Sequence, residues 1–190
     1  MAIPLLETRR LVLRPFVRAD VDALWAVLGD AEAMAFYPHP LSHAETSLWI
    51  ERNLQRYERL GFGLLGLTLI DTGELVGDCG PTIQVVEGAD ELEIGWHVRR
   101  DLWNRGLASE AAVAVRDWVW SALGRTRLIS LVRPENVASC RVAEKLGMTV
   151  ERLADFHGYT HRVYAMSAPP RPAGTRRAVR TPPTSGPSPA

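Results

Sequence analysis

The stretch ELEIGWHVRRDLWNRGLASEAA, residues 91–112, decides the fold and most of the chemistry that we predict. Residues 91–98 read as a β-strand, and the Ala- and Val-rich residues 106–123 read as a helix. Between them, Gly106 allows the backbone to approach a ligand closely. A strand, a glycine-containing turn and a helix N-terminus gather backbone N–H groups that favour bound phosphate. We therefore predict an anion site here, although an ordinary capped helix after a loop would show the same spacing.

Cap and turn residues divide the rest of the chain into alternating elements. Ser42 and Glu45 form a capping box, Asp20 is expected to cap an earlier helix, and Gly73 suits a hairpin turn after residues 62–70. The order β α α β β β α β α β β predicts an α/β domain with a mixed sheet and helices on both faces. The expected strands are 10–14, 62–70, a strand from residue 75, 91–98, 128–132, 148–153 and 161–166; the expected helices start at residues 20, 42, 106 and 136.

Composition divides the 190 residues into a domain, 1–167, and a tail, 168–190. The tail holds four arginines, no acidic residue and seven of the 13 prolines, so we predict that it is disordered. The formal net charge is zero, so the domain alone carries four excess acidic residues and is not a basic nucleic-acid binder. Two cysteines exclude a disulfide framework, and no apolar run is long enough to span a membrane. We expect a soluble, cytoplasmic protein.

Two motifs together resemble those of the GCN5-related N-acetyltransferases. They are W-x-x-G-x-A-S-E-A, from Trp103 to Ala111, and N-x-x-S-x-x-V-A-E-K-L-G-M, from Asn136 to Met148. The opening L-E-T-R-R-L-V-L-R-P-F, residues 6–16, and E-I-G-W, residues 93–96, resemble the subgroup that acetylates N-terminal alanine or serine of ribosomal proteins. The resemblance covers about residues 6–167 and implies a mixed, mostly antiparallel sheet.

The resemblance implies that acetyl-CoA lies in a wedge where strands 91–98 and 128–132 splay apart. The side chain of Asn136 would bind the pantetheine arm or the amine. From their place before the loop, Arg99 and Arg100 could meet the phosphates or could simply be solvated. Asn104 stands where the family usually has glycine, but asparagine tolerates a positive φ. The backbone groups expected to hold the cofactor belong to Trp96, His97 and Val98 for pantetheine, and to Asn104, Arg105, Gly106, Leu107, Ala108 and Ser109 for pyrophosphate.

The amine would enter from the opposite side of the wedge. The resemblance implies that its walls are the loop between the first two helices and the last hairpin. We expect substrate contacts from Phe36, Tyr37, Glu91 and Asp155. Neighbouring wall residues are His39, Phe156, His157 and Tyr159.

Glu93 is our first candidate for the base that deprotonates the amine, directly or through a water. Glu91 shares its face at the period of a strand, and Asp155 is a third candidate. Both glutamates could instead face solvent or pair with arginine. Ser139 could donate a hydrogen bond to the cofactor sulfur or cap its helix. Many family members carry a tyrosine, acting as general acid, where this chain has Ala143.

The sequence thus predicts an acetyl-CoA-dependent N-acetyltransferase that moves the acetyl group directly to a primary amine, most plausibly a protein N-terminus. The alternatives are a small-molecule amine as acceptor, such as an antibiotic or a polyamine, and a non-catalytic acyl-CoA sensor. The histidine spacing predicts no metal site. We expect no direct nucleic-acid partner, no membrane partner, and a monomer or homodimer.

Overall fold

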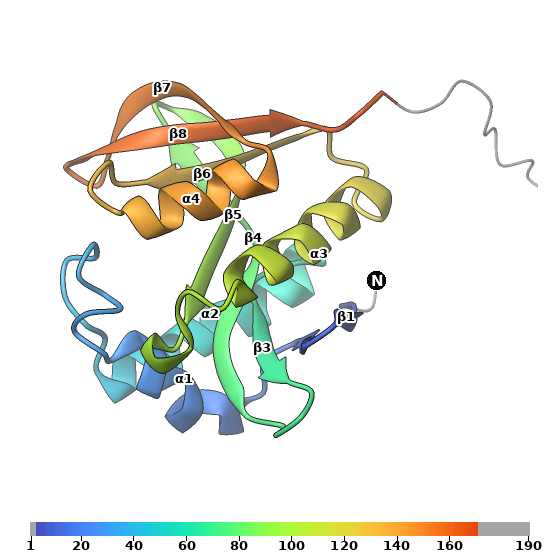
Figure 1. Cartoon of the computed structure of the whole chain (residues 1–190), viewed down its shortest axis with the longest axis vertical. Helices are drawn as coiled ribbons and strands as arrows, with labels where there is room; N and C mark the ends of the chain where they lie inside the picture. The colour runs from blue at the N-terminus through green and yellow to red at the C-terminus, as the bar shows by residue number, and fades with distance from the viewer. Residues whose placement is uncertain (1–2, 171–190) are drawn as a thin grey trace, which may run out of the picture.

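The computed structural model describes residues 3–170, which form one eight-stranded sheet with the strand order β1-β2-β3-β4-β5-β6-β8-β7 (Figure 1). Most of the tail that we predict to be disordered, from residue 171 onward, lies outside the described residues. Within residues 3–170, no helix is both long enough and apolar enough to cross a membrane.

The predicted order of elements is confirmed, with one addition at the start. A two-residue strand, β1 (Leu6–Glu7), precedes the first predicted strand and pairs with it. The other strands are β2 (Leu11–Arg14), β3 (Leu65–Leu69), β4 (Leu75–Val86), β5 (Ala89–Val98), β6 (Arg127–Val132), β7 (Thr149–Phe156) and β8 (Tyr159–Ser167). The helices are α1 (Val21–Leu28), α2 (His43–Leu60), α3 (Leu107–Ser121) and α4 (Val137–Leu146), with short 3-10 turns η1 (Arg18–Asp20) and η2 (Arg100–Leu102).

Local capping chemistry sets the ends of α2 as expected. The Ser42 hydroxyl accepts a hydrogen bond from the Glu45 N–H, and the Glu45 carboxylate accepts one from the Ser42 N–H. Gly61 ends the helix with a φ of 74°. The predicted cap on α1 is wrong, because the Asp20 carboxylate instead accepts hydrogen bonds from the Arg14 guanidinium and the Val17 N–H.

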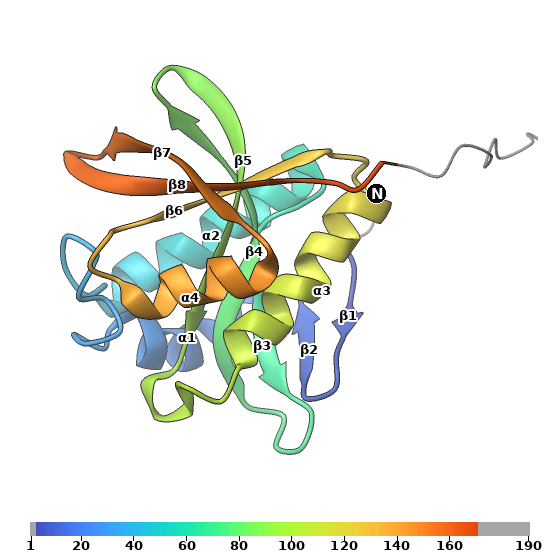
Figure 2. The same cartoon turned by 45° about the horizontal axis from the view of Figure 1, so that its top comes forward.

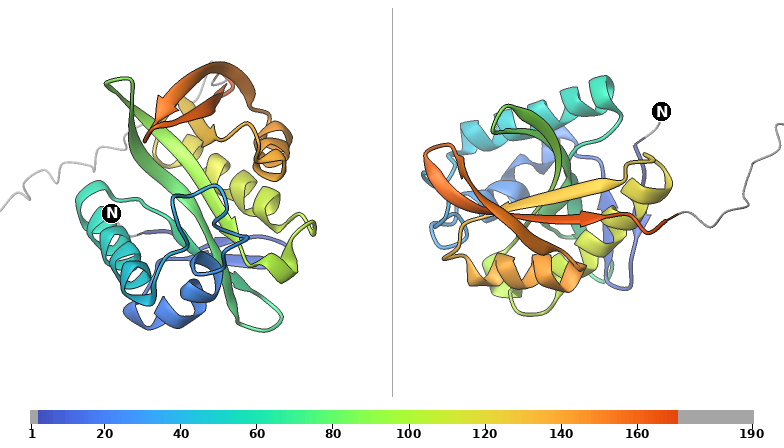
Figure 3. Two further views of the ribbon diagram at one scale, coloured as in Figure 1. Left: turned by 90° about the vertical axis from the view of Figure 1, so that its left-hand side faces the viewer. Right: turned by 90° about the horizontal axis from the view of Figure 1, so that it is seen from above.

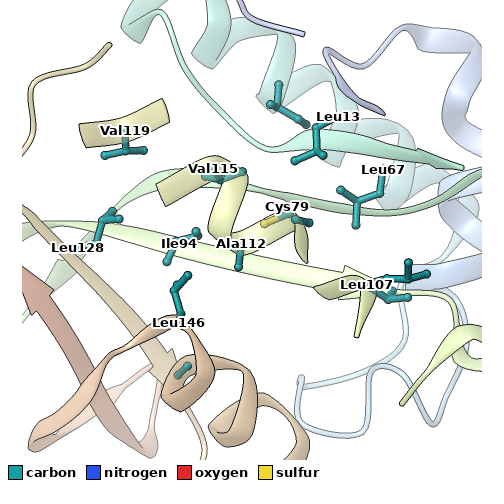
Figure 4. Packing of buried hydrophobic residues seen from close by; sticks show 14 of the residues in the cluster. Leu13, Leu67, Cys79, Ile94, Leu107, Ala112, Val115, Val119, Leu128 and Leu146 are labelled. Atoms are coloured by element: carbon teal, nitrogen blue, oxygen red, sulfur yellow. The ribbon is translucent and has the colours of Figure 1, made fainter. Parts of the chain in front are cut away.

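Helices cover both faces of the sheet, as predicted. α1 and α2 lie against one face, and α3 and α4 lie against the other (Figure 3). The larger core lies under α3, where Ala112, Val115 and Val119 pack over Ile94 and Leu128 of the central strands (Figure 4). This packing fills the face of β5 that carries Ile94. The opposite face of β5 lies on the side of α1 and α2.

The sheet opens between β5 and β6. Every other pair of neighbouring strands is antiparallel, and β4 pairs with β5 over ten residues, from Gly77–Val98 to Val86–Ala89. By contrast, β5 and β6 are parallel and pair at a single register, Glu93–Ile129. Beyond it the two strands diverge toward the carboxyl end of β5 (Figure 2). This is the wedge that the resemblance implied.

Candidate active site

Only alternate residues of β5 direct their backbone N–H and C=O groups toward the wedge between β5 and β6. The Arg99 N–H donates to the Val76 carbonyl, so odd-numbered residues of β5 bond to β4 and even-numbered residues face the other edge. Along that edge the Ser130 hydroxyl donates to the Ile94 carbonyl at 2.5 Å, and the Trp103 indole donates to the Val98 carbonyl at 2.7 Å. Trp96 lies between these two points and turns its N–H and C=O into the wedge.

This alternation changes one predicted cofactor contact. His97 pairs with Asp78 across the β4–β5 ladder, so its backbone groups point away from the wedge. Backbone pairing of His97 with a pantetheine arm, which the sequence had suggested, is therefore disfavoured. Trp96 and the N–H of Val98 remain suitable.

The predicted anion loop, residues 103–109, has the expected backbone geometry. Asn104 and Gly106 adopt positive φ angles of 60° and 78°. The Glu110 N–H donates to the Gly106 carbonyl, so the N–H groups of residues 107–109 precede the first hydrogen bond of α3. No side chain caps this helix end. Its free donors and the positive end of the helix dipole together suit a phosphate group.

Side chains around the loop are held by ion pairs. Glu110 accepts hydrogen bonds from the Thr8 hydroxyl and from Arg10, which joins α3 to the first hairpin. Arg10 also donates to the Arg105 carbonyl at 2.8 Å. Arg99 pairs with Asp101 and Glu74, and Arg100 pairs with Asp30 and Glu32. Both arginines predicted to meet phosphate are therefore already paired with acidic side chains.

The second motif forms the start of α4. The Asn136 side chain accepts a hydrogen bond of 3.1 Å from the Ser139 N–H and so caps the helix. Asn136 thus takes the capping role that the sequence had left open for Ser139. The Ser139 hydroxyl and the Asn136 amide N–H₂ remain for other partners.

The face of β5 on the side of α2 carries Glu91, Glu93, Gly95 and His97. We call it the acceptor face, because the predicted amine would enter there. Glu91 lies farthest from the wedge, and both its oxygens accept hydrogen bonds from Arg127, at 3.0 and 2.9 Å. Arg127 also pairs with Glu151. Glu91 therefore pairs with an arginine, which was the alternative that we considered to a role as the base.

Glu93 has a different environment. Its carboxylate accepts hydrogen bonds from the Gln84 amide at 2.7 Å and from the Leu131 N–H at 3.3 Å. None of the ion pairs among residues 3–170 involves Glu93. Burial raises the pKa of the Glu93 carboxyl in spite of these hydrogen bonds, which favour the charged form. A partly buried carboxylate with a raised pKa is suited to accept a proton.

Gly95 leaves a gap between Glu93 and His97. A Cβ atom on Gly95 would meet nothing within 4 Å. Gly80, which pairs with it on β4, is covered instead, because a Cβ there would lie 2.4 Å from the Gly63 carbonyl oxygen. The acceptor face is therefore open at Gly95 and closed one strand away.

On the other side of the gap, the His97 imidazole joins three segments of the chain. Its Nδ1 lies 2.7 Å from the Asp78 carboxylate of β4, and its Nε2 lies 2.7 Å from the Tyr37 hydroxyl of the loop between α1 and α2. The Trp49 indole of α2 donates to the second Asp78 oxygen at 3.1 Å. Asp78 is fully buried, and the His97 side chain is 10% exposed.

Sequence reasoning missed this cluster. His97 was predicted to contribute its backbone alone, and Tyr37 was predicted to contact the substrate. The one signal was a charged residue, Asp78, between Gly77 and Cys79 in a stretch expected to be a strand. A buried carboxylate needs a partner, but the sequence does not name it.

The last hairpin shows local roles for the remaining predicted residues. The Asp155 carboxylate accepts a hydrogen bond from the Gly158 N–H and stabilises the turn. The ring of Phe156 packs against His157 and His161, and the Arg133 guanidinium lies 4.4 Å from the centre of the Tyr159 ring. Their contact with an acceptor, like that of Phe36, stays a prediction.

Comparisons with known proteins agree with this geometry. The acetyltransferase (GNAT) domain family matches residues 10–149. The protein YkkB of Bacillus subtilis is 36% identical over 146 residues, which cover 75% of this chain and 84% of YkkB. The crystal structure of an acetyltransferase from Agrobacterium tumefaciens superposes with a TM-score of 0.75 at 33% identity, covering 87% of this chain and 95% of that one.

A more distant structure shares the fold and was solved with a ligand. It is RimL, described as a ribosomal L7/L12 alpha-N-protein acetyltransferase in complex with coenzyme A. The TM-score is 0.67 at 22% identity, over 88% of this chain and 98% of RimL.

Proposed function

This chain belongs to the acetyltransferase (GNAT) family, and from that premise we propose that it transfers the acetyl group of acetyl-CoA directly to a primary amine. The acceptor we propose is a protein N-terminal α-amine. The observation that carries the proposal is the divergence of β5 and β6 after the single pair Glu93–Ile129, directly beside the uncapped N-terminus of α3.

The cofactor would follow the free edge of β5. Its pyrophosphate would accept hydrogen bonds from the N–H groups of residues 104–109, and its pantetheine arm would pair with the backbone of Trp96 and the N–H of Val98. The Asn136 amide N–H₂ lies free of the α4 cap for a further contact. The complex of RimL with coenzyme A supports this assignment by analogy of fold.

The acceptor would approach the gap at Gly95 from the other face of the sheet. An ammonium group is attracted to the partly buried carboxylate of Glu93, which takes a proton from it. The neutral amine then attacks the acetyl carbonyl carbon, and the C–S bond breaks. The tetrahedral oxyanion would be held by a backbone N–H of β5, and the Ser139 hydroxyl would donate to the sulfur.

Three considerations favour an α-amine as acceptor. An α-amine has a pKa of about 7.7–8.0, against about 10.4 for lysine, so its deprotonation at pH 7 costs only about 1 kcal/mol. The four excess acidic residues of the domain also attract a cationic acceptor. RimL, which shares the fold, is described as acting on a protein α-amine.

The test is thiol release from acetyl-CoA with a panel of peptides that begin with Ala, Ser or Met, together with spermidine and an aminoglycoside. We expect turnover with the N-terminal peptides and at least a hundredfold loss of kcat in Glu93→Gln. Glu51→Gln, which changes a carboxylate paired with Arg18 on the surface of α2, is the matched control.

Three results would contradict the proposal. Turnover with spermidine or the aminoglycoside alone would make the acceptor a small molecule. Tight coenzyme A binding without turnover of any amine would identify a sensor. An unchanged rate in Glu93→Gln would remove Glu93 as the base.

A further inference from the structure

The residues on the two sides of the Gly95 gap suggest that one side supplies the base and the other side the acid of the reaction. Glu93 and His97 lie on the same face of β5, four residues apart, which is about 13 Å along a strand. A thioester bound beside Gly95 would lie midway between them, about 6–7 Å along the strand from each. Both side chains extend from the sheet on this face, and no Cβ fills the space between them.

The hydrogen bonds of His97 suit a doubly protonated ring. Nδ1 lies 2.7 Å from a carboxylate and Nε2 lies 2.7 Å from a phenolic oxygen, and both of these oxygens can accept. Burial opposes a charge on His97, but the Asp78 carboxylate outweighs it and raises the pKa of His97 above its ordinary value. The Trp49 indole, bound to the other Asp78 oxygen, fixes the orientation of the carboxylate.

We propose that Asp78, His97 and Tyr37 form the acid side of acetyl transfer, in which Tyr37 protonates the departing thiolate and His97 restores its proton. This inference rests on the proposed function. Many members of the family that this chain resembles carry a tyrosine as general acid where this chain has Ala143. The inference names the residue that would take over this role.

The proton transfers balance as follows. Collapse of the tetrahedral intermediate breaks the C–S bond and leaves the electron pair on sulfur, which takes the Tyr37 phenolic proton. The Tyr37 oxygen takes the proton on Nε2 of His97, and the ring becomes neutral and keeps its Nδ1–H on Asp78. A proton from solvent then recharges His97, because Tyr37 is 42% exposed and its segment borders water. The amine protons leave through Glu93.

Three titratable groups interact with the His97 ring. They are Asp78 from β4, Glu93 from β5 and Tyr37 from the loop between α1 and α2. The α2 helix presents the uncharged Trp49 ring, with its centroid 6.0 Å from that of His97. Since a charged His97 is required, kcat should fall as the pH rises through the raised pKa of His97.

The test compares Tyr37→Phe, His97→Gln and Asp78→Asn with the wild type in pH profiles of kcat at saturating amine. We expect kcat to fall about ten- to a hundredfold in Tyr37→Phe and His97→Gln, because a thiolate needs only modest acid assistance. Asp78→Asn should move the alkaline limb to lower pH, and His97→Gln should abolish it. Coenzyme A affinity and the melting temperature of Tyr37→Phe should stay unchanged.

His43→Gln is the matched control. His43 makes a 2.7 Å contact with Asp22 on the surface and bonds to none of the residues of the relay. An unchanged kcat in both Tyr37→Phe and His97→Gln would overturn the relay and leave the transferase intact. A lower kcat with an alkaline limb that no variant moves would also overturn it, by showing a purely structural role. A wild type that binds coenzyme A but transfers nothing would overturn the proposed function itself.

Discussion

Replacing Gly95 by alanine separates stability from activity more sharply than any other change on the acceptor face. The added methyl group would meet no atom within 4 Å, and Gly95 has no positive φ that alanine would strain. Glycine in a strand costs roughly 0.5–1 kcal/mol relative to alanine, so Gly95→Ala should be more stable by about that amount. For a chain of this size the gain is about 1–4 °C in melting temperature.

The same methyl group would stand in the gap where acetyl group and amine must meet. Displacing reacting atoms by about 1 Å can cost on the order of a hundredfold in rate. We expect Gly95→Ala to lower kcat/KM for the amine at least tenfold, and Gly95→Val to lower it further. Coenzyme A affinity should change little, because the methyl points to the face opposite α3.

Thermal unfolding and amine-dependent thiol release, measured on the same preparations, check this prediction. Gly80→Ala is the structural counterpart, since its methyl would meet the backbone at Gly63 and should destabilise the protein. Full activity in Gly95→Val would refute the reasoning, because the gap would then play no part in transfer. A loss of stability in Gly95→Ala would show that the gap is filled.

Two further predictions concern the α4 cap and the Asp20 ion pair. Asn136→Ala should destabilise the protein by about 1 kcal/mol, whereas Asn136→Ser should keep the cap and weaken coenzyme A binding; unchanged affinity in the serine variant would remove Asn136 from the cofactor site. Burial works against the Asp20 carboxylate, but hydrogen bonds from Arg14 and the Val17 N–H prevail and lower its pKa. Its stabilisation, about 1.5–3 kcal/mol, should be complete above the unfolded pKa of about 3.9 and lost as pH falls through the lower folded value. Urea unfolding of Asp20→Asn and wild type should therefore differ at pH 7 and converge in strong acid; equal stabilities at pH 7 would contradict this.

The sequence identified the elements and the backbone geometry of the anion loop because both depend on local backbone chemistry. The Ser42–Glu45 box and the positive φ at Asn104 and Gly106 involve residues close in the chain. Such features are set by hydrogen bonds within a turn, so spacing alone reveals them. The prediction that Asp20 caps α1 was wrong, since Arg14 on the preceding strand competes for its carboxylate.

The acceptor side depends on contacts between distant segments, and tertiary structure alone decided it. The period of a strand placed Glu91 and Glu93 on one face, but Arg127 pairs with Glu91, and Glu93 makes no ion pair among the described residues. In the same way His97 meets Asp78 and Tyr37 only because β4 and the loop after α1 pack beside β5. The sequence by itself therefore determined the fold and the anion loop, which are encoded by neighbouring residues. Which carboxylate lacks an ion pair and which imidazole has a raised pKa follow from burial and from partners far along the chain.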